Sequence, residues 1–177
     1  MVTDGLLNDS HANPFYYSIM LGNFNNCKNM NDLYSISEVR LSYESNKTGK
    51  KKIKVKSSAE VYELMLTCWE QIEYRESFRI LLLDISSHVL GINTVSLGGI
   101  SKTTVDIKMI LQGALLANAS AIVAVHNHPS GNTQPSAEDD AITVRIRQAA
   151  KIMDIELTDH LIISKEGYFS YADEGRL

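Results

Sequence analysis

Residues 121–125 (Ala-Ile-Val-Ala-Val) form a continuous apolar run that lies between two segments with helical periodicity. In residues 106–117 and 137–153 the apolar side chains recur three and four positions apart, as one face of an α-helix requires. A short, unbroken apolar run is typical of a strand that is covered on both faces. We therefore expect residues 121–125 to be a buried central strand of an α/β fold.

The remaining segments alternate between strand and helix in the same way. Residues 78–83 and 89–95 are predicted strands, and residues 155–164 and 168–171 are predicted to complete the sheet. A helix of about 15 residues is predicted from Ser58, because apolar residues follow the helical period there. This alternation predicts an α/β sandwich around a central mixed sheet.

The N-terminal part of the chain has a different character. Residues 1–33 are rich in Asn, Ser and Met and show no sustained period, so we interpret them as a poorly ordered arm. One domain is expected over residues 34–177. Within it, residues 36–43 and 53–55 are predicted to pair as a hairpin through the turn-rich link at 45–49.

Composition excludes several classes of protein. Of the 177 residues, 44% are hydrophobic and 21% charged, which is typical of a soluble globular domain. The net charge of −4 argues against a general attraction to nucleic acid or anionic membranes. Cys27 and Cys68 form no Cys-x-x-Cys pair, so neither a disulfide framework nor a thiolate zinc site is expected. With no signal peptide and no membrane-spanning apolar run, we expect a cytoplasmic protein.

A cluster of lysines marks the predicted hairpin: Lys47, Lys50, Lys51, Lys52, Lys54 and Lys56. Two interpretations stay open. The lysines contact phosphates or an acidic protein, or they are a solvated edge that the charges protect from pairing. Since the chain is acidic, we expect no sequence-specific nucleic-acid binding and only weak, salt-sensitive association.

The residues with candidate chemistry directly follow the central strand. His126 and His128 are two positions apart, so in an extended segment both imidazoles point to one side. Ser136 begins the next helix, and Asp139 lies one turn into it, facing back toward the loop. Two nitrogens and one carboxylate oxygen are the protein ligands of a catalytic zinc, which keeps a fourth position open. The pattern predicts one zinc ion per chain, held by His126, His128 and Asp139.

Ser136 and Asp139 also have a purely structural interpretation. A serine at the start of a helix is a common N-cap, and an acid in the first turn suits the helix dipole. The two roles are compatible, because the cap fixes the start of the helix and so aims Asp139.

The spacing His-x-His-x7-Ser-x2-Asp resembles the JAMM signature, and this sequence matches it at His126, His128, Ser136 and Asp139. The later Asp159-His160 pair and the ending at 167–175 are similar to the RadC-like branch. The resemblance covers residues 35–177. It implies a cytidine-deaminase-like three-layer sandwich with a central mixed sheet, known as the JAB/MPN fold.

The resemblance also implies an activity, which is zinc-dependent hydrolysis of peptide or isopeptide bonds in a peptide or protein substrate. Ser136 would be catalytic as a hydrogen-bond donor to the reacting oxygen. His160 has two open interpretations: it supports the metal ligands, or it is a core histidine with satisfied hydrogen bonds.

One departure from the family bears on catalysis. JAMM enzymes use a glutamate on an upstream strand as general base, and alignment on Gly98-Gly99 puts Thr94 at its place. The strand at 88–96 contains no acid. The alternative is therefore a catalytically impaired, zinc-stabilised interaction module linked to DNA metabolism or repair. Deamination is a weaker alternative, because deaminases need a Pro-Cys-x-x-Cys motif that this sequence lacks.

Overall fold

The structure is a computed structural model that describes residues 52–98 and 105–177. In this part of the chain the elements are α2 (Ser58–Cys68), β1 (Ser77–Leu83), β2 (Val89–Leu97), α3 (Ile107–Leu116), β3 (Ala121–Asn127), α4 (Ala137–Ile152), β4 (Glu156–Ile163) and β5 (Tyr168–Ser170). The predicted arm at 1–33, the domain boundary at 34 and the strand at 36–43 lie outside the described residues.

The five strands form one mixed sheet in the order β2-β1-β3-β4-β5. β1 is antiparallel to both β2 and β3, β3 is parallel to β4, and β4 is antiparallel to β5. A parallel pair needs a crossover connection, which α4 supplies between β3 and β4. The predicted central position of residues 121–125 is confirmed, because β3 has two strands on each side.

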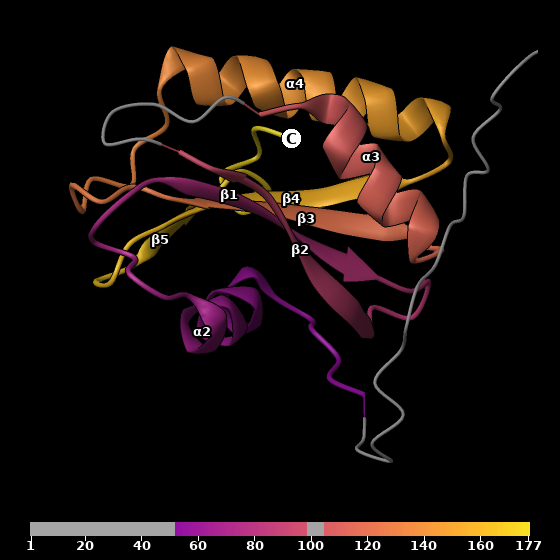
Figure 1. The fold of residues 1–177 in the computed structure, drawn as a ribbon, viewed down its shortest axis with the longest axis horizontal. Coiled ribbons are helices and arrows are strands. Elements are labelled where there is room, and N and C mark those ends of the chain that lie inside the picture. Colours follow the sequence, from indigo (N-terminus) through magenta and orange to yellow (C-terminus); the bar gives the residue numbers. More distant parts are fainter. Residues whose placement is uncertain (1–51, 99–104) are drawn as a thin grey trace, which may run out of the picture. The chain divides into compact units, whose positions relative to one another are not determined.

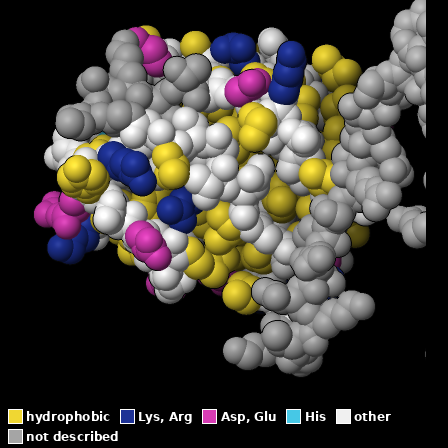
Figure 2. Space-filling view, in the orientation of Figure 1, with side chains coloured by type: hydrophobic (Ala, Val, Ile, Leu, Met, Phe, Trp, Pro, Cys, Tyr) yellow, Lys and Arg dark blue, Asp and Glu magenta, His cyan; other side chains and the backbone are white. Residues whose placement is uncertain are grey.

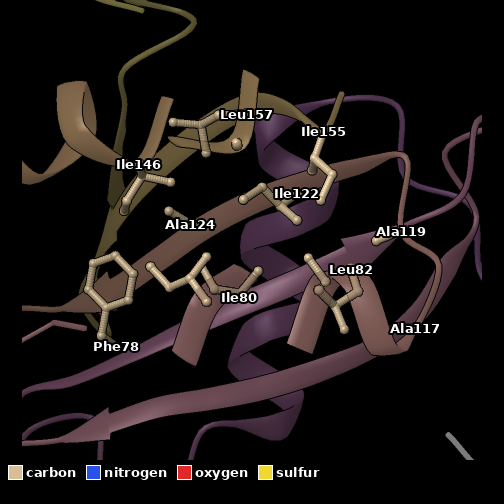
Figure 3. Close-up of a cluster of buried hydrophobic side chains, with 13 residues drawn as sticks. Phe78, Ile80, Leu82, Ala117, Ala119, Ile122, Ala124, Ile146, Ile155 and Leu157 are labelled. Atoms are coloured by element: carbon tan, nitrogen blue, oxygen red, sulfur yellow. The ribbon is translucent and has the colours of Figure 1, made fainter. Parts of the chain in front are cut away.

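Helices cover both faces of this sheet and make it the middle of three layers (Figure 1). Alternate residues of β1 point to opposite faces, as the pleat requires. Ile80 and Leu82 pack in a cluster with residues of α3 and α4, whereas Leu81 and Leu83 pack against α2. Figure 3 shows the first of these clusters, which fills the space between the sheet and the α3/α4 layer. The predicted three-layer sandwich is confirmed.

α2 is shorter than predicted. Ser57 caps its start by accepting a hydrogen bond from the backbone N–H of Glu60. The helix ends after 11 residues at Cys68, whose carbonyl accepts a hydrogen bond from Arg79 Nη1 at 2.7 Å. Ile72 still packs in the cluster below the sheet, but from a turn. Ile72 follows the helical spacing in the sequence, and it contributes to the same core from a backbone that is not helical.

The segment before α2 pairs with the start of β2. The Val55 N–H donates to the Ser87 carbonyl at 3.1 Å, and the Val89 N–H donates to the Ile53 carbonyl at 2.8 Å. The sequence did not predict this contact. Lys54 therefore lies along a sheet edge, and the side chains of Lys52, Lys54 and Lys56 are exposed. The other lysines of the cluster, Lys47, Lys50 and Lys51, lie outside the described residues.

The surface of the described residues carries mixed charges. On the face shown in Figure 2, basic and acidic side chains are scattered among apolar and uncharged ones. Within the described ranges, no helix has the length and apolar character needed to cross a membrane.

Candidate metal centre

The site lies where β3 ends and α4 begins. His126 is in β3 and is only 1% exposed. Its neighbour across the sheet is Phe78 of β1, and the two rings stack at 5.7 Å with an interplanar angle of 10°. Phe78 belongs to the cluster beneath α3 and α4. His126 therefore presents its imidazole on the face of the sheet that α4 covers.

His128 directly follows β3 and continues its extended backbone by one residue, which still bonds to β4. Its N–H donates to the carbonyl of Ile163, the last residue of β4, at 3.0 Å. This keeps the alternation intact, so His126 and His128 point to the same side, as their spacing predicts. The loop that follows leads into α4, which begins at Ala137 and carries Asp139.

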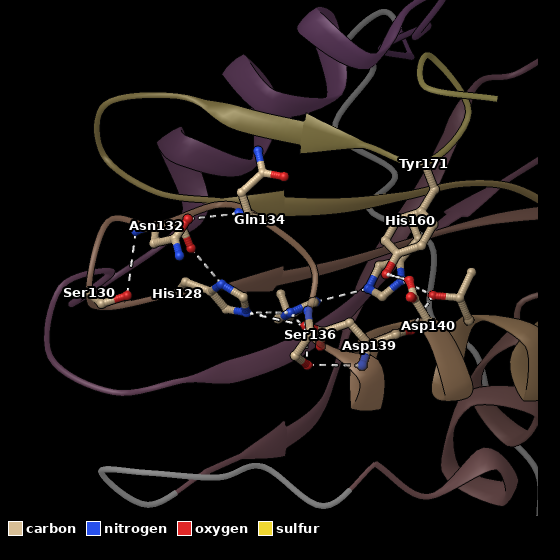
Figure 4. Close-up of polar contacts among 11 residues, drawn as sticks. His128, Ser130, Asn132, Gln134, Ser136, Asp139, Asp140, His160 and Tyr171 are labelled. Carbon is tan, nitrogen blue, oxygen red and sulfur yellow. Dashed lines mark hydrogen bonds and ion pairs between the residues drawn. The ribbon is translucent and has the colours of Figure 1, made fainter. Parts of the chain in front are cut away.

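Nitrogen and oxygen atoms of three side chains converge in this corner, where Figure 4 labels His128 and Asp139. His126 Nε2 lies 3.0 Å from His128 Nε2 and 3.1 Å from Asp139 Oδ1. His128 Nε2 lies 3.6 Å from Asp139 Oδ2. In a tetrahedral site with metal–ligand bonds of about 2.0–2.1 Å, ligand atoms lie about 3.3 Å apart. The three side chains therefore fit one small cation. Among the described residues, they are the one cluster of histidine, cysteine and acidic side chains close enough to share a metal ion.

The other ring nitrogen of each histidine has a partner of its own. His128 Nδ1 donates to the backbone carbonyl of Asn132 at 2.7 Å. His126 Nδ1 lies 2.9 Å from Nε2 of His160. Such partners leave Nε2 of each ring as the nitrogen that faces the ligand group. The chemistry of the donors fits a divalent transition metal, for which imidazole and carboxylate are common ligands.

Ser136 holds Asp139 in a capping box. The Asp139 N–H donates to Ser136 Oγ at 3.2 Å, and the Ser136 N–H donates back to Asp139 Oδ2 at 2.8 Å. The serine hydroxyl also donates to the same Oδ2 at 2.7 Å. The predicted N-cap is thus confirmed, and it aims Oδ1 at His126. The catalytic role of Ser136 stays a prediction.

The carboxyl group of Asp139 is held in its ionised form. Burial by itself would raise its pKa, but in the metal-free site the hydrogen bond and positive charge of a protonated His126, with the hydrogen bonds from Ser136, keep the pKa well below the usual range. An anionic oxygen beside two imidazole nitrogens favours the binding of a cation.

The structure brings His160 to the site and adds a residue that the sequence analysis missed. His160 is completely buried, and burial is the main cause that lowers its pKa well below the usual value. Its Nδ1 lies 2.6 Å from the hydroxyl of Thr143. The four-residue interval from Asp139 to Thr143 puts both on one face of α4, and this spacing is the signal that identifies Thr143.

The alignment on Gly98-Gly99 predicted Thr94 at the place of the general base, but in the structure Thr94 does not face the ligand group. In the β1–β2 register Thr94 pairs with Arg79, whose guanidinium lies 4.3 Å from the ring centroid of Trp69 on the α2 side of the sheet. Paired residues share a face, so Thr94 points away from the ligand group. Its neighbour Asn93 points to the α3/α4 face and donates to the Met109 carbonyl at 3.4 Å. Strict alternation from Ser96, which pairs with Phe78, would put Thr94 on the α3/α4 face. The register shifts between Phe78 and Arg79, which leaves Val95 as a bulge and turns Thr94 to the α2 face.

Comparison with known proteins agrees with this geometry. A sequence model of the RadC-like JAB domain matches residues 55–176. The chain belongs to the RadC-like JAB family. This RadC-like domain is 40% identical over 125 residues to a UPF0758 protein of Thermotoga maritima, an alignment that covers 70% of the chain and 55% of that protein.

Two further relatives give the same result. A UPF0758 protein of Porphyromonas gingivalis is 43% identical over 104 residues, which cover 58% of the chain and 46% of that protein. A UPF0758 protein of Aquifex aeolicus is 37% identical over 131 residues, which cover 74% of the chain and 56% of that protein. The RadC-like chain therefore spans about half the length of the curated relatives it matches.

Proposed function

We propose that this RadC-like domain is a zinc-dependent metallopeptidase-like hydrolase that cleaves peptide or isopeptide bonds. The observation that carries the proposal is the convergence of one nitrogen each from His126 and His128 and one oxygen of Asp139, all within 4.8 Å of one another. Three protein ligands of this composition are typical of catalytic zinc sites, whereas magnesium and calcium prefer oxygen ligands. Membership of a family with the JAMM signature supports the same choice.

Each residue has a distinct role in this proposal. With a metal ion bound, His126 and His128 would supply neutral nitrogens, and Asp139 would supply the single negative charge. A bound zinc ion would polarise a carbonyl group and acidify a water molecule. Asp139 Oδ2 already accepts two hydrogen bonds from Ser136, so its Oδ1 is the oxygen directed at His126. The Ser136 hydroxyl donates its proton to Asp139 Oδ2 in the absence of substrate, and with substrate bound it would turn to donate to the reacting oxygen.

A catalytically impaired interaction module is the second candidate. The observation that favours it is the absence of any acidic residue in β2. A positioned general base contributes about 10²–10⁴-fold to a rate. Without one, the metal would chiefly stabilise the fold and a surface for a partner, including one that acts in DNA metabolism.

One experiment separates the two candidates. The protein is loaded with zinc, desalted and analysed for metal content, then incubated with a panel of linear and isopeptide-linked peptides with and without a chelator. Hydrolysis that needs zinc and is lost in His128→Ala supports the enzyme. The matched control is His88→Ala, because His88 bonds to Asp84 and lies outside the ligand group. Stoichiometric zinc without hydrolysis supports the interaction module, and no bound zinc excludes both.

A further inference from the structure

A continuous chain of hydrogen bonds runs behind the ligands. Nδ1 of His126 lies 2.9 Å from Nε2 of His160, and Nδ1 of His160 lies 2.6 Å from Oγ1 of Thr143. The Thr143 hydroxyl in turn bonds to the backbone carbonyl of Asp139 at 2.6 Å. The chain therefore connects a ligand on β3 to a ligand on α4.

Counting protons gives this chain a single direction. The Asp139 carbonyl can only accept, so the Thr143 hydroxyl donates its one proton to it. Thr143 then has only lone pairs left for His160, which must donate from Nδ1. A completely buried imidazole favours the neutral form, so Nε2 of His160 accepts. The remaining proton must lie on Nδ1 of His126.

Aromatic rings fix the planes of the two imidazoles. Phe78 stacks on His126 at 5.7 Å, and Tyr171 stacks on His160 at 5.0 Å, both with an interplanar angle of 10°. Tyr171 is itself anchored, because its hydroxyl donates to Asp140 at 2.8 Å. Rotating either imidazole out of its plane would break its hydrogen bonds and its stack together, whereas a half-turn within the plane would still break the hydrogen bonds.

We propose that His160 and Thr143 are positioning residues of the metal centre, which hold the proton of His126 on Nδ1 and so reserve its Nε2 lone pair for the ion. The proposal rests on the proposed function. The other tautomer of His126 would direct an N–H at the ion and exclude it from coordination. Loss of a partner that orients a metal-bound histidine costs about 10–100-fold in metal affinity. We expect a loss of this size when the chain is broken.

The test compares two substitutions of one residue. Thr143→Val keeps the shape of the side chain but removes both hydrogen bonds, whereas Thr143→Ser keeps the hydroxyl. Zinc affinity is measured by competition with a chromophoric chelator. Thr143→Val should bind zinc about 10–100-fold more weakly, and Thr143→Ser should recover most of the loss. Thr158→Val is the matched control, because the Thr158 hydroxyl also donates to a backbone carbonyl, that of Ile122. Its affinity should equal that of the wild type.

A second measurement does not depend on zinc. NMR of the ring nitrogens in the metal-free wild type should show protons on Nδ1 of both His126 and His160. A His126 protonated on Nε2 and not on Nδ1 would overturn the proposal, as would wild-type zinc affinity in Thr143→Val. If the wild type binds no zinc, the proposed function fails, and the tautomers still decide whether His160 and Thr143 act on His126.

Discussion

Replacing His128 with alanine should remove the stability that zinc gives to this domain. His128 Nε2 lies 3.0 Å from Nε2 of His126 and 3.6 Å from Asp139 Oδ2. Without it two ligands remain, and a zinc site of this kind uses three from the protein. The variant should therefore unfold at the same temperature with and without zinc.

The size of the lost effect follows from binding linkage. A ligand that binds only the folded state at about 100 times its dissociation constant stabilises that state by about 2.7 kcal/mol. For a domain of roughly this size, 1 kcal/mol shifts the melting temperature by about 2–4 °C. Zinc should thus raise the melting temperature of the wild type by about 5–11 °C.

The substitution also changes the metal-free protein, but less. It removes the hydrogen bond from His128 Nδ1 to the Asn132 carbonyl, a contribution of about 0.5–1.5 kcal/mol. Asn132 is exposed, so water can replace this donor. Removal of His128 also eliminates the contact between Nε2 of His126 and Nε2 of His128, which face each other in the absence of metal. The difference between scans with zinc and with chelator is therefore the quantity to compare.

Thermal unfolding followed by calorimetry measures this difference directly. His88→Ala is the control and should keep the full zinc-dependent shift, because His88 bonds to Asp84 and takes no part in the ligand group. If His128→Ala keeps a shift of wild-type size, His128 is not a ligand and the assignment of the site is refuted.

Three other predictions follow from the same structure. Thr94→Glu should leave zinc-dependent hydrolysis unchanged, because residue 94 faces α2. A rise of about 10²–10⁴-fold in peptide assays, the contribution of a positioned general base, would contradict the assigned register. In metal-free protein the lowered pKa of Asp139 gives stability above its unfolded pKa of about 3.9, and this stability disappears as the pH falls through the folded value. Denaturant titrations should therefore show a flatter acid limb for Asp139→Asn, and an unchanged limb would show that this carboxylate is not stabilising. Duplex DNA should bind weakly and lose affinity steeply with salt, and tight binding at about 0.15 M salt in an anisotropy assay would favour a DNA-linked module.

Much of the fold was predictable because it depends on local periodicity. The apolar run at 121–125 identified the central strand, and the helical spacing at 137–153 identified α4. The end of α2 was not predictable in the same way. Ile72 continues the helical pattern in sequence, yet the helix stops at Cys68, where a distant residue, Arg79, bonds to its terminal carbonyl. A contact between α2 and β1 decides that boundary.

The candidate ligand group was predictable from the sequence itself. His126 and His128 share a side because they are two apart on extended backbone, and Asp139 faces back because Ser136 caps the helix three residues earlier. Both relations are local, so spacing alone encodes them.

Only the tertiary structure decided which other residues serve the site. Thr94 was placed at the site by counting from a glycine turn, but the bulge at Val95 shifts the pairing with β1 and turns Thr94 to the opposite face. His160 and Thr143 reach His126 from β4 and α4, which meet only when the sheet is assembled. Side-chain alternation is a property of one strand, whereas register and hydrogen bonding between elements depend on packing that no single segment encodes.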